Sequence, residues 1–163
     1  MATSIAGVRL ARFRPGHVEL LAATMAANPY AMEDDFARDP EANLRAIAVA
    51  PDSVMFSVEH GGCWLGGAYL SGIREHSCWI SAYLRPGGGV FRAGAALAET
   101  GRYAARRLGV SRVQASVCAD NAVTLAVCGR CGFQVYGRFK QAWRHRGRVH
   151  DGVLLAKTGG WHG

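Results

Sequence analysis

The chain has 163 residues, a mass of 17.4 kDa, an apolar fraction of 50%, a mean hydropathy of +0.03 and a net charge of +7. This length is typical of one domain with a full hydrophobic core, and no apolar run approaches the roughly 20 residues that a helix needs to cross a bilayer, so we expect no membrane contact. The start of the chain has no secretory hydrophobic segment, which predicts a cytoplasmic protein whose five cysteines are reduced thiols.

The first half of the chain carries alternating strand and helix signals. Apolar residues at every second position predict an edge strand over 8–13. Two helices follow, over 17–27 and 41–49, and an acidic, irregular segment over 30–39 separates them. Three further apolar runs with turns between them predict a meander of antiparallel strands, over 54–58, 64–70 and 78–84.

A glycine run, Gly87–Gly89, precedes a long predicted helix over 90–108. Small and apolar residues recur along this helix at intervals of three and four, and we interpret its internal glycines as allowing close contact with the sheet. No Ser, Thr, Asp or Asn stands directly before Val90 to cap the helix. Free backbone amides and the positive end of the helix dipole suit a phosphate group, so this segment is a candidate anion site.

The segment 112–133 combines a strand and a short helix. Alternation predicts a strand over 113–118, Asn121 is suited to cap the helix that follows, and Gly132 is suited to end it. Val123, Val127 and Cys131 are spaced to share one helical face. Two more strands, over 139–143 and 153–157, are expected to bracket a basic turn, with a loose tail over 159–163.

The sequence does not favour a metal or a nucleic acid as the ligand. Cys128 and Cys131 form a C-x-x-C pair, but both fall within the predicted helix and no second ligand pair accompanies them, so we expect no metal site. The net charge is −2 over residues 1–100 and +9 over 101–163. A one-sided basic face fits nucleic acid, yet no RNA-binding motif or zinc finger accompanies it. We therefore favour attraction of an anionic cofactor over nucleic acid, and a solvated face is the other alternative.

The order and spacing of several short motifs resemble the GNAT superfamily of acyl-CoA N-acyltransferases, and most closely its RimJ/RimL branch, which acetylates protein N-terminal amines. The matching motifs are Asn121-x-x-Thr124, Gly132-Phe133, Phe139-Lys140-Gln141-Ala142 and Gly147-Arg148-x-x-Asp151. The resemblance implies one α/β (α+β) domain over 1–158, with a central mixed, mostly antiparallel twisted sheet flanked by helices. It also implies acetyl-CoA or another acyl-CoA as co-substrate, an amine of a peptide N-terminus or small molecule as acceptor, and a monomer or homodimer.

The same resemblance assigns binding residues for the cofactor. Tyr83 and Leu84 would pair with the pantetheine arm through their backbone, and Asn121 would bind that arm if it is not simply a helix cap. The family binds the pyrophosphate through a loop patterned Gln/Arg-x-x-Gly-x-Gly/Ala, and here Val90 or Phe91 replaces a small residue in either possible register. The segment that would bind the phosphates consists of Gly87, Gly88, Gly89, Val90, Phe91, Arg92, Ala93 and Gly94.

For the chemistry, the resemblance points to Thr124 or Cys128 as the group that assists the departing thiolate. An ordinary cysteine thiol has a pKa close to that of a thiol such as CoA, so Cys128 could donate a proton. Residue type alone favours the alternative role of a small buried apolar side chain. The branch has a glutamate as base where this chain has Trp143. The remaining candidate bases are Glu75, His145, His76, Glu59 and His60.

The function predicted from the sequence is acyl transfer, most simply of an acetyl group, to a primary amine by direct attack in a ternary complex. One alternative keeps the fold and changes the donor, to a longer acyl-CoA or an aminoacyl-tRNA. The other alternative is a non-catalytic binding module with the GNAT fold. The missing glutamate at Trp143 and the altered glycine loop favour that second alternative.

Overall fold

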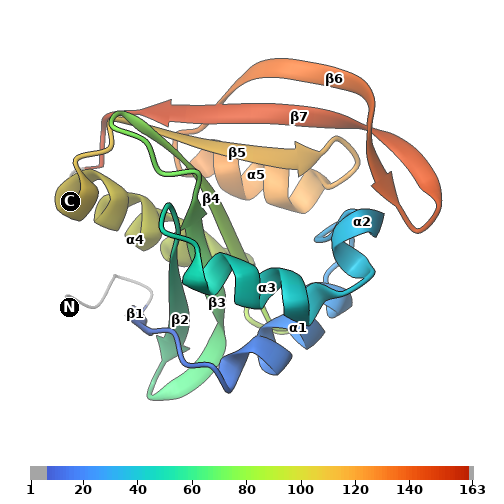
Figure 1. Cartoon of the computed structure of the whole chain (residues 1–163). Helices are drawn as coiled ribbons and strands as arrows, with labels where there is room; N and C mark the ends of the chain where they lie inside the picture. Colours follow the sequence, from blue (N-terminus) through green and yellow to red (C-terminus); the bar gives the residue numbers. More distant parts are fainter. Residues whose placement is uncertain (1–6, 162–163) are drawn as a thin grey trace.

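The computed structural model describes residues 7–161 and consists of one sheet of seven strands in the order β1-β2-β3-β4-β5-β7-β6, flanked by helices (Figure 1). All pairs are antiparallel except β4 with β5. The strands are β1 (Val8–Arg12), β2 (Val54–His60), β3 (Cys63–Ser71), β4 (Ser77–Leu84), β5 (Arg112–Cys118), β6 (Gln134–His145) and β7 (Arg148–Thr158). The helices are α1 (His17–Ala27), α2 (Asp34–Ala37), α3 (Pro40–Val49), α4 (Val90–Leu108) and α5 (Ala122–Arg130). The predicted fold class, a mixed and mostly antiparallel sheet with helices, is confirmed.

The sheet has a hydrophobic core on each face. On one face, α1 and α3 cover Met55 and Tyr69, and on the other, α4 covers Phe56 and Leu70. Neighbouring strand residues therefore point to opposite faces, as strand geometry requires. No helix in the described part of the chain is long and apolar enough to cross a bilayer.

The start of α3 shows how local sequence sets an element. Asp39 accepts a hydrogen bond from the N–H of Ala42 at 3.1 Å, and Pro40 occupies the first turn, where its missing N–H is not needed. The segment 30–39, which the sequence predicts to be irregular, instead contains the short helix α2. Two acidic residues in its first turn, Asp34 and Asp35, suit the positive end of a helix.

The glycines of α4 have another role than the predicted contact with the sheet. A Cβ on Gly101 would lie 2.2 Å from the indole ring of Trp161, and one on Gly94 would lie 3.7 Å from the sulfur of Cys131. Gly101 therefore makes room for Trp161, which is only 5% exposed and also packs against Phe133. The prediction of a loose tail is wrong at this residue, because the indole is buried against α4.

The β6–β7 hairpin is longer than the predicted strands and reaches the α2 region, as Figure 1 shows at its right-hand edge. A bulge between Phe139 and Trp143 interrupts its pairing, and there the N–H of Gln141 donates to Asp151. At the hairpin tip, the carboxylate of Asp34 accepts the N–H groups of Arg146 and Gly147 at 2.6 and 2.9 Å. The Gly147 N–H, as the largest cause, lowers the pKa of Asp34. These bonds attach the hairpin to the α1–α2 region.

Strands β4 and β5 diverge along their length, and this divergence creates the site. Their parallel pairing covers only residues 77–79 of β4 and 112–114 of β5. Beyond that point the two strands separate, and Ala82, Leu84 and Val117 line the opening between them. One edge of each strand is therefore free to meet a ligand instead of a neighbouring strand.

Candidate active site

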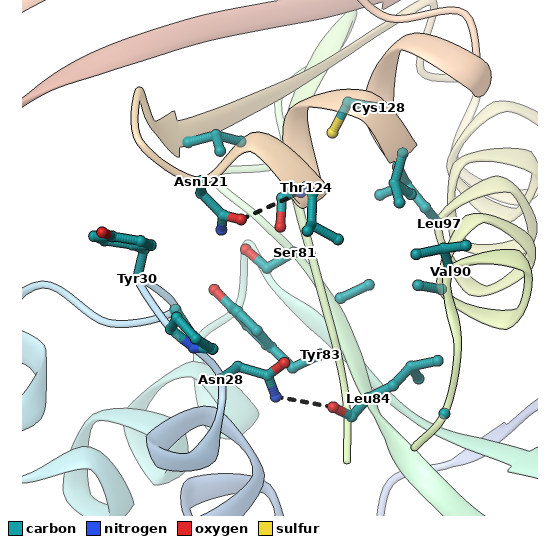
Figure 2. Close-up of a pocket in the computed structure, with 18 of the residues that line it drawn as sticks. Asn28, Tyr30, Ser81, Tyr83, Leu84, Val90, Leu97, Asn121, Thr124 and Cys128 are labelled. Atoms are coloured by element: carbon teal, nitrogen blue, oxygen red, sulfur yellow. Dashed lines mark hydrogen bonds between the residues drawn. The ribbon is translucent and has the colours of Figure 1, made fainter. Parts of the chain in front are cut away.

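A cavity of about 490 Å³ occupies the opening between β4 and β5. The loop after α1, the glycine loop before α4 and the first turns of α5 close it from three sides (Figure 2). Its volume falls within the range of roughly 300–1,000 Å³ that is usual for small-molecule sites. Apolar residues such as Leu97 and Val127 line one wall, and polar groups of Asn28, Ser81 and Asn121 face it from the other elements.

The end of β4 presents main-chain groups to this cavity. The N–H of Arg85 donates to Leu65 of β3 at 2.9 Å, whereas the carbonyl of Leu84 accepts from the side chain of Asn28 at 2.9 Å. Because consecutive strand residues turn their polar groups to opposite sides, the N–H of Leu84 points away from β3, toward the opening. Asn28 also donates to the carbonyl of Thr24, at 2.7 Å, which ties the cavity wall to α1.

The glycine loop has a backbone conformation that only glycine adopts readily. Gly87 and Gly89 have φ values of +86° and +83°, and a Cβ on Gly88 would lie 3.0 Å from the Cβ of Leu84. No side chain in residues 7–161 caps α4, so its first N–H groups are available to a ligand. Arg85 lines the cavity beside this loop, and Arg92 lines a smaller hollow on its outer side. Both guanidinium groups favour an anion here.

The N-terminus of α5 forms the opposite wall. The side-chain oxygen of Asn121 accepts the N–H of Thr124 at 3.2 Å and so caps the helix. Its amide nitrogen makes no hydrogen bond to any residue of the described chain and remains a donor for a ligand. The cap and the ligand roles, which are alternatives in the sequence, are therefore compatible. Thr124 and Cys128 both face the cavity, one turn apart (Figure 2).

The thiol of Cys128 and the hydroxyl of Tyr83 both line the cavity, and both stay protonated. Burial raises the pKa of Cys128 to about 12, and the neighbouring Cys131 adds to the effect. Burial, with Tyr69 as the next cause, also raises the pKa of Tyr83 well above its ordinary value. The premise that Cys128 has the pKa of an ordinary thiol is therefore wrong. Its thiol can still donate a hydrogen bond, but it releases a proton far less readily than CoA does.

Comparison with known proteins gives a consistent answer at the level of fold. No family model and no curated protein matches the sequence. Among solved structures, a chimera of the Vibrio cholerae spermidine N-acetyltransferase SpeG with hSSAT aligns with a TM-score of 0.80 at 18% identity, over 93% of this chain and 95% of that one. Mycobacterium smegmatis RimJ in complex with CoA-disulfide aligns with a TM-score of 0.75 at 22% identity, over 93% and 82%. A ribosomal-protein-alanine N-acetyltransferase from Brucella melitensis aligns with a TM-score of 0.76 at 24% identity, over 93% and 99%. The chain has the GNAT fold.

The GNAT fold brings most of the predicted cofactor residues to one place. The cavity is lined by Tyr83, Leu84, Gly87, Gly88, Gly89, Val90, Ala93, Asn121 and Thr124. Phe91 and Arg92 line instead the smaller hollow beside the glycine loop. The side chain of Phe91 is 80% exposed there. Gly94 does not line the cavity, because it packs against α5 and its carbonyl accepts from the thiol of Cys131 at 3.4 Å.

The candidate bases named from the sequence do not reach the cavity. Glu75 lies before β4, at the end remote from Leu84, and its exposed carboxylate pairs with His76 at 3.6 Å. His145 lies closer, on β6, but both of its ring nitrogens are engaged: Nδ1 with the carbonyl of Met32 at 2.9 Å and Nε2 with the N–H of Tyr30 at 3.3 Å. The structure thus makes His145 part of the contact between the hairpin and the α1–α2 loop.

Asp120, His150 and Tyr30 are site residues that sequence analysis does not identify. Asp120 and Tyr30 line the cavity, and Nδ1 of His150 is hydrogen-bonded to the carboxylate of Asp120. The sequence places Asp120 directly before the helix cap Asn121, which is the one local signal for this site. Nothing in the sequence links Asp120 to His150, which lies on a strand 30 positions later. Together with the thiol of Cys118, these two residues bring their ligand atoms within 4.8 Å of one another. The pair meets through the register of β7 against β5 and β6.

Proposed function

We propose that this protein transfers an acyl group, with acetyl as the expected one, from acyl-CoA to a primary amine by direct attack in a ternary complex. The observation that carries the proposal is the cavity between the diverging strands β4 and β5, which ends at the uncapped N-terminus of α4. An extended chain with a polyanionic end fits this shape, and the pantetheine arm of CoA is such a chain. Acetyl-CoA is an intracellular metabolite, so we also propose that the protein is cytoplasmic. We propose a monomer or homodimer as its oligomeric state.

The cavity suggests where each part of the co-substrate binds. The pyrophosphate would accept hydrogen bonds from the N–H groups of Gly87–Gly89 and of the first turn of α4. Arg85 and Arg92 would add positive charge. The amides of the pantetheine arm would pair with the free edge of β4, as an added strand does. The side-chain amide of Asn121 supplies a further donor from the opposite wall.

The thioester would then lie between the end of β4 and the start of α5. When the amine attacks the carbonyl carbon, a C–N bond forms and negative charge develops on the carbonyl oxygen. The N–H of Leu84, which faces the opening, can stabilise that charge because it is fixed before the reaction starts. The C–S bond then breaks, and the hydroxyl of Thr124 can donate a hydrogen bond to the departing thiolate.

The amine would enter from the end of the cavity that Tyr30, Asp120 and Trp143 line. Asp120 offers a carboxylate to an ammonium group. The indole N–H of Trp143 is buried and has no hydrogen-bond partner among residues 7–161, so a carbonyl of the acceptor could satisfy it. The names of the similar structures include a spermidine and a ribosomal-protein-alanine N-acetyltransferase. Both a polyamine and a peptide N-terminus are therefore substrates to test.

Thermal stability with acetyl-CoA, followed by a turnover assay, tests the proposal. We expect acetyl-CoA to raise the melting temperature, because a ligand at 100 times its Kd stabilises the native state by about 2.7 kcal/mol. Mass spectrometry should then detect acetylated spermidine or an acetylated alanine-starting peptide. Binding without transfer to any amine would favour the non-catalytic module. A larger thermal shift with a long-chain acyl-CoA than with acetyl-CoA would favour the alternative donor.

A further inference from the structure

The imidazole of His150 occupies a special position on the β6–β7 hairpin. Its Cα pairs with that of Trp143 in the sheet register, so the two side chains lie on the same face of the hairpin. Trp143 lines the cavity but has no group that accepts a proton. His150 is therefore the ionisable residue directly across from the cavity wall, and its side chain is only 13% exposed.

A carboxylate links this imidazole to the cavity. Asp120 lies in the turn between β5 and α5, and one of its oxygens is bonded to Nδ1 of His150. Its side chain is 59% exposed and lines the cavity, so the second oxygen remains accessible to a substrate. Asp120 therefore joins the amine end of the cavity to an imidazole that is mostly withdrawn from solvent.

The groups around His150 come from every element that packs against it. The ring of Tyr30 meets the imidazole edge-on with a centroid distance of 5.4 Å, and the ring of His145 lies at 6.5 Å. The thiol of Cys118 lies within 4.8 Å of the pair, and Glu33 acts electrostatically on that thiol. The carboxylate of Asp120 can only accept a hydrogen bond, so Nδ1 of His150 carries the hydrogen that joins the two groups.

We propose that the Asp120–His150 pair accepts the proton that the acceptor amine must lose before it attacks. This inference rests on the proposed acyl transfer. The ammonium group contacts the free oxygen of Asp120, which takes the proton and becomes a carboxylic acid. The Nδ1–H of His150 donates to the other oxygen and holds the carboxyl group in place. The amine lone pair then forms the C–N bond and the C–S bond breaks. The nitrogen gives up its second proton to the departing thiolate, and the carboxylic acid of Asp120 releases its own proton to solvent. A carboxylate suits this role because it accepts with either oxygen, so one oxygen can meet the ammonium group while the other is held by His150.

The test is the pH dependence of kcat/KM for two variants, with spermidine and an alanine-starting peptide as acceptors. Asp120→Asn removes the proton acceptor, and His150→Ala removes the imidazole that holds it in place. At about pH 7 we expect each to lower kcat/KM on the order of 100-fold. The difference should shrink as the pH rises, because more of the amine then arrives already deprotonated. His76→Gln, which changes an exposed imidazole far from the cavity, should keep the wild-type pH profile.

A second measurement protects the test against a merely structural effect. His150→Ala should regain activity when free imidazole is added, and wild type should not respond to it. If both variants stay within about threefold of wild type at every pH, or if His150→Ala is not rescued, the proposed role of the pair is wrong. These results are informative only when wild type transfers the acyl group. Absence of wild-type transfer to every amine would instead contradict the proposed function itself.

Discussion

Substitution of the glycine loop should weaken CoA binding through the phosphates alone. Gly89 has a φ of +83° and a ψ of 152°, a region that only glycine adopts readily, and no atom lies within 4 Å of where its Cβ would be. A side chain therefore meets no steric clash there, but the backbone conformation becomes costly, by about 1–3 kcal/mol. Gly89→Val should relieve this strain by turning the loop and displacing the first N–H groups of α4.

The expected loss in affinity follows from these displaced donors. A hydrogen bond to a charged group contributes roughly 1.5–3 kcal/mol, so the loss of one amide–phosphate contact should raise the Kd for CoA at least tenfold, about 1.4 kcal/mol. Gly88→Val should act similarly, because its Cβ would lie 3.0 Å from the Cβ of Leu84. Isothermal titration calorimetry measures the Kd, and circular dichroism confirms that each variant is folded.

Two controls separate a phosphate effect from a general one. Gly16→Ala changes a glycine with an ordinary φ of −66° and open space around it, so it should leave the Kd unchanged. S-acetylpantetheine lacks the pyrophosphate, and its weaker binding should be equal for wild type and the loop variants. A folded Gly89→Val protein that binds CoA within about twofold of wild type would refute the placement of the phosphates on this loop.

Three further predictions concern individual side chains. Thr124→Val should lower kcat on the order of 100-fold with little change in the Kd for CoA, as measured by turnover and calorimetry. An unchanged kcat would exclude the hydroxyl from the reaction. Cys128→Ala should lower kcat less, because a thiol with a raised pKa contributes only a hydrogen bond. At pH 8, iodoacetamide should label the exposed Cys63 well before Cys128, whose pKa of about 12 leaves almost no thiolate; mass spectrometry of the peptides gives the order, and equal rates would contradict the burial. Trp161→Ala should reduce the free energy of unfolding by roughly 3 kcal/mol in urea titrations, as for a core tryptophan, whereas a change below about 0.5 kcal/mol would be typical of a surface position.

The regular elements were largely predictable because their signals are local. The helix over 90–108 coincides with α4, since a glycine run precedes it, Gly109 ends it and its small and apolar residues keep helical spacing. The meander strands also agree to within two residues. In contrast, β6 is exposed along most of its length, so apolar alternation reveals only part of it.

The features that the sequence did not reveal depend on distant contacts. The indole of Trp161 is buried in the space that the missing Cβ of Gly101 leaves, and nothing near either residue in the sequence indicates their contact. The shared helical face of Val123 and Val127 does not reveal that Val127 is buried whereas Val123 is 63% exposed beside the cavity. The Asp120–His150 pair depends on sheet register, which composition and periodicity do not determine.

The central claim is that the cavity between β4 and β5 delivers an acyl group from CoA to an amine. The most direct measurement incubates the purified protein with acetyl-CoA and with spermidine or an alanine-starting peptide, and follows both free CoA and the mass of the amine. The account predicts that CoA release and acetylated amine rise together and in equal amounts, and that Gly89→Val needs more acetyl-CoA to reach the same rate. Acetyl-CoA that neither raises the melting temperature nor yields an acetylated amine would contradict it.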